Sequence, residues 1–238
     1  MRIAIDTHVH SVASGHAYST VEELAMGARR AWLEGFVLTD HGPALPGGTY
    51  PYHFGNMRVL PDRIRGVRFY RGIEANVLDL EGNLDLDDKG FERLHFVMAG
   101  LHEACFAPRS AEENTKALVM ALRNPRVDAI SHPGNPLYPV NIDELVEEAR
   151  AQGKALEINN SSFKVRAGSA DACLEIARAC ARTGTRVVVG SDAHHWRDVG
   201  NFAAASKVLR EARMPRELVV NASLRSFEAF IGRRANAV

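Results

Sequence analysis

Cysteine is scarce in this sequence, and the few cysteines do not suggest disulfide bonds. Cys105, Cys173 and Cys180 form no C-x-x-C pair, and an odd number argues against a disulfide framework. Cys173 and Cys180 are seven residues apart on one side of an expected helix, a spacing that favours packing in the core over a reactive role. We therefore expect reduced thiols and a cytoplasmic protein.

An excess of charge and long apolar runs are also missing. The 29 basic residues balance the 29 acidic ones, so no bulk charge attracts nucleic acid or an anionic membrane. No segment approaches the roughly 18 apolar residues of a membrane span. The beginning of the sequence also lacks the apolar stretch of a signal peptide. Selectivity must then come from a local site.

Short apolar runs alternate with helical patterns along the chain. The expected strands are residues 3–5, 36–38, 69–73, 96–99, 129–131, 155–158 and 187–189. A capping box at residues 20–23 starts a helix that runs to Trp32, and further helices begin near Asn114, Asn141 and Ser169. This alternation indicates parallel βαβ units in a barrel or a long open sheet.

Histidine and carboxylate residues recur just past these apolar runs. They are His8, His10, His16, His41, Glu74, His102, His132, Asp192 and His194. Imidazole and carboxylate groups hold zinc, iron or manganese, and the set exceeds the about four ligands of one tetrahedral ion. A lone pair such as His8 and His10 also occurs in polar loops, but the repetition at several strand ends favours two or three metals.

The same residues decide between the barrel and the open sheet. They follow the strands from first to last, so all the strand ends must converge on one point, as they do in a closed barrel. We predict a distorted (β/α)7 barrel in one domain, residues 1–238, with the metal site at the carboxyl ends of the strands. Residues 42–58 are expected to form a long loop beside the site, and residues 203–234 to form helices that close the fold.

Other polar residues are candidates for supporting roles. Asp6 and Asp40 could accept imidazole N–H groups, although a turn or cap role is an equal alternative. The candidates for substrate binding follow the sixth strand, and they are Asn159, Asn160, Ser161 and Arg166. Lys164 and Arg197 could add positive charge near them.

Three histidines stand outside the predicted ligand set. His95 is expected to have a structural role. His53 could contact the substrate or pack against the protein. His195 is the alternative ligand if His194 points away from the site.

The motifs around these residues resemble the polymerase and histidinol phosphatase (PHP) superfamily, most closely its YcdX-like phosphatases. The matching segments are DTHVHS (6–11), SGHAYST (14–20), TDHGP (39–43), RGIEAN (71–76), SHPGNP (131–136), EINNSSF (157–163) and GSDAH (190–194). The resemblance spans nearly the whole chain, and no ligand position is substituted. It implies a trinuclear site, most simply of zinc, with manganese or iron as alternatives.

The resemblance also implies how the ligands divide among the three metals. The first metal would be held by His8, His10, Glu74 and Asp192. Glu74 would bridge to a second metal, which His102 and His132 complete. The third metal would be held by His16, His41 and His194. Within this set, Glu74, Asp192 and His194 are the expected catalytic residues.

Charge balance favours an anionic substrate at such a site. Three divalent ions carry about six positive charges, whereas Glu74 and Asp192 supply two negative ones. We expect a phosphoric monoester hydrolase in which a hydroxide bridging the first two metals attacks phosphorus in line. The expected partner is a small phosphorylated substrate, and neither nucleic acid nor a membrane is expected to bind. The sequence leaves the oligomeric state open, with a homo-oligomer as one possibility.

Four other interpretations of the sequence remain. A histidinol-phosphate or nucleotide phosphatase of the same superfamily would use the same metals. A dinuclear amidohydrolase would leave His16, His41 and His194 without a task. A polymerase-associated nuclease would call for a basic stripe that the sequence lacks. A non-catalytic metal-binding protein would more naturally use closed, cysteine-rich sites.

Overall fold

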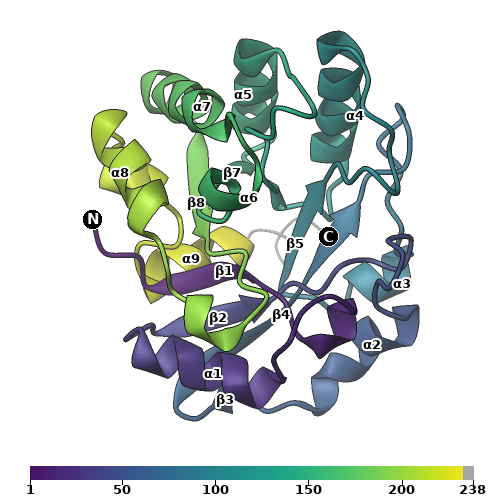
Figure 1. Cartoon of the computed structure of the whole chain (residues 1–238), viewed down its shortest axis with the longest axis vertical. Helices are drawn as coiled ribbons and strands as arrows, with labels where there is room; N and C mark the ends of the chain where they lie inside the picture. Colours follow the sequence, from purple (N-terminus) through teal and green to yellow (C-terminus); the bar gives the residue numbers. More distant parts are fainter. Residues whose placement is uncertain (233–238) are drawn as a thin grey trace.

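Seven parallel strands form the centre of the fold in the computed structural model, which describes residues 1–232 (Figure 1). They are β1 (Ile5–Val9), β2 (Gly35–Leu38), β4 (Val67–Asn76), β5 (Phe96–Gly100), β6 (Ala129–Ile130), β7 (Ala155–Asn159) and β8 (Arg186–Gly190). Their order in the sheet is their order in the chain, and the short β3 (Arg63–Ile64) pairs antiparallel with β4.

The sheet curves round until its last strand reaches its first. Val9, at the end of β1, forms a parallel bridge with Ala193, which follows β8. The backbone N–H of Asp192 donates to the carbonyl of His8 at 2.8 Å, and that of His10 donates to the carbonyl of Ala193 at 2.9 Å. The predicted distorted (β/α)7 barrel is therefore confirmed, nearly closed at this seam.

All seven expected strands are present, but the first was placed too early. Residues 3–5 were expected, whereas β1 begins at Ile5 and runs to Val9. The backbone N–H of Ala4 instead donates to the carbonyl of Asn221 at 2.9 Å, so the chain start pairs with a C-terminal segment. This contact joins distant parts of the sequence and leaves no local signal. As a result His8 lies inside a strand and not beyond its end.

Helices surround the barrel on its outer side, except for the last one, which closes its amino end. The longer ones are α1 (Val21–Arg30), α4 (Ala111–Arg123), α5 (Ile142–Ala151), α7 (Ser169–Thr183), α8 (Ala203–Glu211) and α9 (Leu224–Ile231). The capping box expected at α1 is present, because the Thr20 hydroxyl accepts from the Glu23 N–H at 3.3 Å and the Glu23 carboxylate accepts from the Thr20 N–H at 2.7 Å. Local sequence therefore fixes this helix start.

Short helical segments fill several of the connections. They are α2 (Pro51–Asn56), α3 (Asp88–Phe91) and α6 (Ser162–Val165), with the 3-10 turns η1 (Val12–Ser14), η2 (Met57–Val59), η3 (Trp196–Asp198) and η4 (Arg216–Leu218). The expectation of a plain loop over residues 42–58 was thus partly wrong, since α2 begins there with Pro51 in its first turn, a position that suits proline. Of the helices expected over residues 203–234, α8 and α9 are present, and residues 233–234 lie outside the described part.

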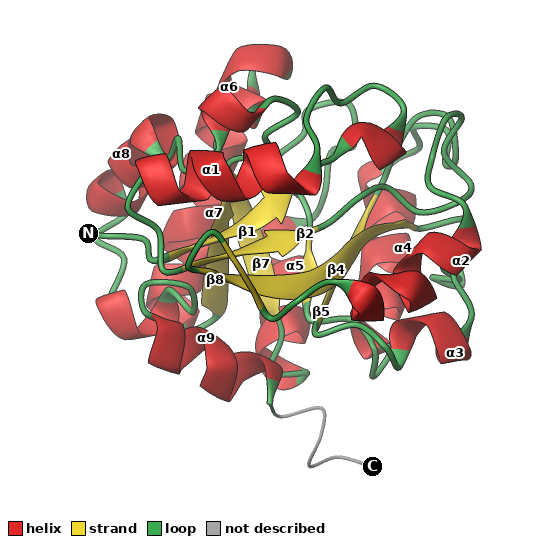
Figure 2. Cartoon of the chain, turned by 90° about the horizontal axis from the view of Figure 1, so that it is seen from below, coloured by secondary structure: helices red, strands yellow, loops and turns green. Residues whose placement is uncertain are grey.

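The barrel is apolar at its amino end and polar at its carboxyl end. Ile5, Val37, Phe96 and other inward-facing strand residues form one buried cluster with Phe227 and Phe230 of α9. Figure 2 shows α9 below the strands, on the side opposite to α6. A second, larger cluster lies between the strands and the outer helices. Apolar side chains fill the amino end of the barrel interior, and the polar side chains of the strands lie at its carboxyl end.

Within the described residues, no helix combines the length and the apolar character needed to cross a membrane. The cysteines are free thiols, and Cys173 and Cys180 are buried in α7, as their spacing predicted.

Candidate metal centre

The nine predicted ligands meet at the carboxyl end of the barrel. Each comes from a strand or from the segment that follows it, so sheet closure brings together residues from both ends of the sequence. Most of them are buried, and His16, His102 and His194 are more accessible. The sheet geometry therefore concentrates imidazole and carboxylate groups in a single place, as expected for a closed barrel.

Glu74, near the end of β4, lies at the middle of the group. Its Oε2 is 3.2 Å from His8 Nε2 and 3.0 Å from His41 Nδ1. Its Oε1 is 2.7 Å from His132 Nε2 and 3.3 Å from His102 Nε2. The two carboxylate oxygens thus face different sets of imidazoles, which is the arrangement required of a carboxylate that bridges two metal ions.

Asp192 provides the second carboxylate, on the side of β1. Its Oδ1 is 3.3 Å from His10 Nε2 and 3.6 Å from His8 Nε2. His8, His10 and Glu74 each direct one ligand atom to a common point, with these atoms within 4.8 Å of one another. The first predicted set of ligands is therefore spatially compact.

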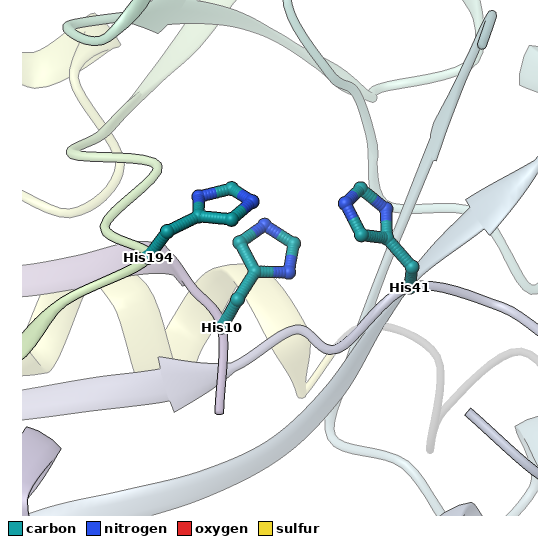
Figure 3. Close-up of side chains that lie close together, drawn as sticks. All are labelled: His10, His41 and His194. Carbon is teal, nitrogen blue, oxygen red and sulfur yellow. The ribbon is translucent and has the colours of Figure 1, made fainter. Parts of the chain in front are cut away.

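A third group of imidazoles lies toward the solvent. Figure 3 shows His10, His41 and His194 directed toward the same space, and their ligand atoms lie within 4.8 Å of one another. His16 joins them, with its Nε2 3.0 Å from His194 Nε2. His41 also groups with Glu74 and His102, so it lies between two of the predicted sets.

Several of these ring and carboxylate atoms are buried without a hydrogen-bond partner among the described residues. They are Nε2 of His8, His10 and His102, Nδ1 of His41 and Oε2 of Glu74. Buried polar atoms without partners are costly, at roughly 1–3 kcal/mol each. Their convergence at one point fits divalent cations, which would satisfy all of them together. The donor set of imidazole and carboxylate matches zinc, and also manganese or iron.

Two of the predicted ligands have left-handed backbone conformations. His132 has φ of 32° and Asp192 has φ of 55°, values that are uncommon for residues with a side chain. Each lies two residues after the last residue of its strand, β6 or β8. The surrounding contacts must over-determine this strained geometry, which is a frequent property of functional sites.

Glu157 on β7 is a supporting residue that the sequence analysis missed. Its Oε1 is 2.8 Å from His8 Nδ1, and its Oε2 accepts the backbone N–H of His132 at 2.8 Å and the Asn159 amide at 3.1 Å. The side chain is fully buried. Its place in an inward strand position beside Asn159 was the available signal, but a single buried glutamate gives no indication of its partner.

Asn76 has a similar role for His102. The Asn76 Oδ1 is 2.7 Å from His102 Nδ1, which directs the other ring nitrogen toward Glu74. Second contacts of this kind fix the tautomer and orientation of a metal-binding imidazole.

Asp40 supports the site indirectly. Its carboxylate accepts the hydroxyls of Ser11 and Ser14 at 2.8 and 2.7 Å, and Ser14 Oγ is 3.4 Å from His10 Nδ1. The imidazole beside Asp40 is that of His53, at 3.2 Å. Asp40 therefore does not contact a candidate ligand directly, as the imidazole role would require, and reaches His10 only through Ser14.

Of the two alternatives for Asp6, the structure supports acceptance of backbone N–H groups and not of an imidazole N–H. Its carboxylate accepts backbone N–H groups of His8, Ser191 and Gly200 at 3.3, 3.0 and 2.8 Å, and no imidazole is among its hydrogen-bond donors in the described residues. Burial raises its pKa to about 6. Asp6 instead joins β1 to the segments after β8, because three amides at the barrel seam require an acceptor.

Comparison with known proteins places the chain in a family. A probable phosphatase of Acetivibrio thermocellus is 47% identical over 238 residues, covering 100% of this chain and 99% of the relative. The chain belongs to this family of probable phosphatases. It matches no family model.

Solved structures share the fold of this family member at much lower identity. A histidinol phosphate phosphatase from Lactococcus lactis, complexed with zinc, L-histidinol and phosphate, aligns with a TM-score of 0.64 and 17% identity over 90% of this chain and 95% of that chain. A probable 2-pyrone-4,6-dicarboxylic acid hydrolase from Acinetobacter baumannii aligns with a TM-score of 0.59 and 15% identity over 98% and 100%. At these identities the likeness concerns the fold alone.

The protonation states of most candidate ligands in this chain suit metal binding. Burial opposes ionisation of Glu74, but neighbouring imidazoles such as that of His8 outweigh it and hold the Glu74 pKa well below its usual value. Burial and nearby charges lower the pKa of His132 to about 4 and that of His10 well below its usual value. These groups are ready to bind cations at neutral pH, since ligands must be deprotonated.

His8 differs from the other imidazoles. Burial disfavours its charged form, but the carboxylates of Glu157, Glu74 and Asp192 outweigh burial and raise its pKa well above the usual value. A positive charge is thus favoured at the point where these carboxylates meet.

The predicted substrate-binding residues separate into different roles. Asn159 is fully buried, and its amide donates to Glu157 and to Asp192 Oδ2. Its predicted role in substrate binding is therefore wrong, and it instead holds the Asp192 carboxylate in place. Asn160 and Ser161 line a cavity next to Asp192. Arg166 Nη1 is 3.3 Å from Asp192 Oδ2, and its side chain is partly exposed.

The remaining histidines are placed apart from the ligand group or at its edge. His95 accepts the backbone N–H of Arg71 at 3.0 Å and contacts its guanidinium at 2.9 Å, in keeping with a structural role. His53 contacts Asp40, which favours packing over substrate contact. His194 faces the centre, so the alternative ligand His195, which caps η3, is not needed.

Proposed function

We propose that this protein is a metal-dependent phosphatase of the PHP superfamily, of the YcdX-like type, in which residues 1–238 act as one domain. It hydrolyses a phosphate monoester at a site that holds three divalent ions, with zinc as the first choice. The observation that carries the proposal is the convergence of five buried, unpartnered ligand atoms around Glu74.

The ligand geometry supports the assignment of separate metal positions. Glu74 Oε2 faces His8, His10 and His41, and Oε1 faces His102 and His132, so one carboxylate serves two positions. Asp192 would complete the first position, beside His8 and His10. The cluster of His16, His41 and His194 would provide the third.

Bound divalent ions would activate water and neutralise charge on the phosphoryl oxygens. The chain itself orients the ligands and supplies a further cation. Arg166 lies beside Asp192 Oδ2, where its guanidinium could also bind a phosphate oxygen, a match that its planar geometry favours. Ser162 Oγ accepts from Arg166 Nη1 at 3.1 Å and fixes the guanidinium at the edge of the site.

The comparisons support phosphate ester chemistry. The relative from Acetivibrio thermocellus, which is 47% identical to this chain, is called a probable phosphatase. The structure from Lactococcus lactis that shares the fold contains zinc and phosphate. The amidohydrolase alternative is less well supported, because the barrel presents Glu74 where those enzymes use a modified lysine. It would also leave His16 and His194 without a function, although their Nε2 atoms are 3.0 Å apart.

Metal content and phosphate release, measured on one sample, test the proposal. We expect near three ions per chain and release of inorganic phosphate from p-nitrophenyl phosphate, lost with a chelator and restored by zinc. Glu74→Gln should lower both metal content and phosphate release, whereas Glu103→Gln, an exposed glutamate next to His102, should change neither. Two ions per chain with no phosphate release would refute the proposal.

A further inference from the structure

A cavity of about 420 Å³ opens beside the candidate metal centre. Asp192 and His194 form the wall shared with the centre, and the opposite walls come from the segment around α6 and from the residues that lead from η3 into α8. If a phosphoryl group is bound at the centre, this neighbouring space can hold the rest of the substrate. Its size lies in the range of small-molecule sites.

Neutral hydrogen-bonding groups line much of this cavity. Asn160 Oδ1 accepts the backbone N–H groups of Ala204 and Ala205 at 3.0 and 3.1 Å, which fixes its amide at the start of α8. Its Nδ2 has no hydrogen-bond partner among the described residues. Ser161 and Asn201 add a hydroxyl and a second amide. These donors and acceptors suit a ligand that carries several hydroxyl groups.

The charged groups of the cavity balance one another. Lys164 and Asp198 both line it, and within residues 1–232 neither forms an ion pair. With one positive and one negative side chain, the lining has no net charge apart from the wall formed by the metal centre. A second phosphate or another strongly anionic group would therefore gain little here, and a neutral leaving group fits better.

The apolar part of the lining contains few large side chains. Phe163 is its one phenyl ring among the described lining residues, beside Val165 and the first residues of α8. A planar base is commonly held by stacking on both faces, but the second ring of this lining, the imidazole of His194, is already assigned to metal binding. A single ring next to amides and hydroxyls instead suits the C–H face of a sugar, whose hydroxyls point outward.

We propose that this cavity binds the alcohol part of the substrate and selects a neutral polyhydroxylated compound, so that the substrate is a sugar or polyol monophosphate. The inference rests on the proposed phosphatase function. It assigns Asn160, Ser161 and Asn201 to hydroxyl groups and Phe163 to a C–H face.

A substrate panel with the zinc-loaded enzyme gives the first test. Phosphate release is compared for sugar monophosphates, glycerol phosphate, adenosine monophosphate, histidinol phosphate and p-nitrophenyl phosphate. We expect at least one sugar or polyol phosphate to have a kcat/KM roughly tenfold above those of the nucleotide and the aryl ester, the equivalent of one or two well-made hydrogen bonds. A preference for the nucleotide or for histidinol phosphate would overturn the inference.

Two variants then locate the preference in the cavity. Asn201→Leu removes an amide whose one side-chain hydrogen bond within residues 1–232 is long, 3.5 Å from its Oδ1 to the Ala203 N–H, so folding should survive. Ser161→Ala removes the assigned hydroxyl on the opposite wall, and because the Ser161 side chain makes no capping hydrogen bond to α6, folding should again survive. Each should lower the ratio of kcat/KM for the best sugar phosphate to that for p-nitrophenyl phosphate by roughly tenfold. Gln152→Leu, an exposed amide at the far end of α5, should leave this ratio unchanged.

The outcomes separate the two proposals. Release of phosphate from the aryl ester without any sugar preference, or with a ratio that both variants leave unchanged, would refute the cavity assignment and leave the phosphatase intact. Absence of phosphate release from every ester, in a protein with its full metal content, would refute the proposed function itself.

Discussion

Glu157 Oε1 lies 2.8 Å from His8 Nδ1, so a buried carboxylate on β7 holds an imidazole on β1. The second oxygen of Glu157 accepts the backbone N–H of His132, whose φ is 32°. One side chain thus orients one candidate ligand and helps to hold the strained backbone of another. Carboxylate–imidazole–metal arrangements of this type raise the basicity of the imidazole and fix its tautomer.

Glu157→Gln should weaken metal binding. An amide can still form one hydrogen bond to His8 but does not carry the negative charge, and we expect a loss of about 10–100-fold in zinc affinity, the usual effect of changing such a partner. Competition with a chromophoric chelator measures the affinity, and circular dichroism verifies the fold. Glu147→Gln, an exposed position on α5, is the matched control. Unchanged affinity in Glu157→Gln would remove Glu157 from the site.

Gly190→Ala should disturb the same contact through packing. A Cβ at this position would lie 2.2 Å from Glu157 Oε1 and 2.4 Å from His8 Cβ, so one of them must move. We expect a loss of stability of about 1–3 kcal/mol, as for other overpacked interiors, together with weaker zinc binding. Gly55→Ala provides the comparison, because its Cβ would meet only the flexible Arg93 side chain, at 3.4 Å. Urea unfolding with equal stability for both variants would contradict the close packing.

His16→Ala should remove one ion and leave the others. His16 contacts His194 through ring nitrogens 3.0 Å apart, on the exposed side of the cluster, whereas His8 and Glu74 are fully buried. We expect elemental analysis to show about one ion fewer per chain, and phosphate release to fall by at least about tenfold if that ion stabilises the leaving oxygen. His195→Ala is the control, as His195 caps η3. Full metal content in His16→Ala would exclude His16 as a ligand.

Metal binding should release a proton near neutral pH. In the metal-free protein the pKa of His8 is raised well above its usual value by Glu157, Glu74 and Asp192, against the effect of burial, so the ring is protonated at pH values below that raised pKa. A metal must displace this proton, and the apparent affinity should rise by about tenfold per pH unit below the His8 pKa for one proton. Calorimetry in buffers of different ionisation enthalpy counts the protons. Affinity that does not change as the pH rises through neutrality toward the raised His8 pKa would disagree with a protonated His8.

The three thiols should react slowly in the folded protein. Burial raises the pKa of Cys173 and of Cys180 to about 12 and that of Cys105 to about 11, so little thiolate exists at pH values near 8, close to the usual thiol pKa. We expect a disulfide reagent to modify Cys173 and Cys180 at rates set by unfolding, and Cys105, which is half-buried, first. In denaturant all three should react at once. Rapid labelling of Cys173 in the folded state would show that α7 opens locally.

Much of the fold was predictable from local patterns. The seven apolar runs became seven strands, and the Thr20 capping box set the start of α1. The errors came where tertiary contacts replace local preference. The first strand is displaced because Ala4 pairs with the Asn221 carbonyl, and α2 occupies part of the expected loop. Neither the Ala4–Asn221 pairing nor the short helix α2 leaves a periodic pattern of apolar residues in the sequence.

The sequence by itself determined that imidazole and carboxylate side chains form the site and that they lie at the strand ends, because residue type sets the ligand chemistry and residue spacing sets the position. Only the tertiary structure decided which ligand faces which oxygen of Glu74, that Asp6 serves backbone amides, and that Asn159 supports Asp192. It also revealed Glu157 beside His8. These relationships join residues far apart in the chain, and closure of the barrel, not local propensity, brings them within hydrogen-bond distance.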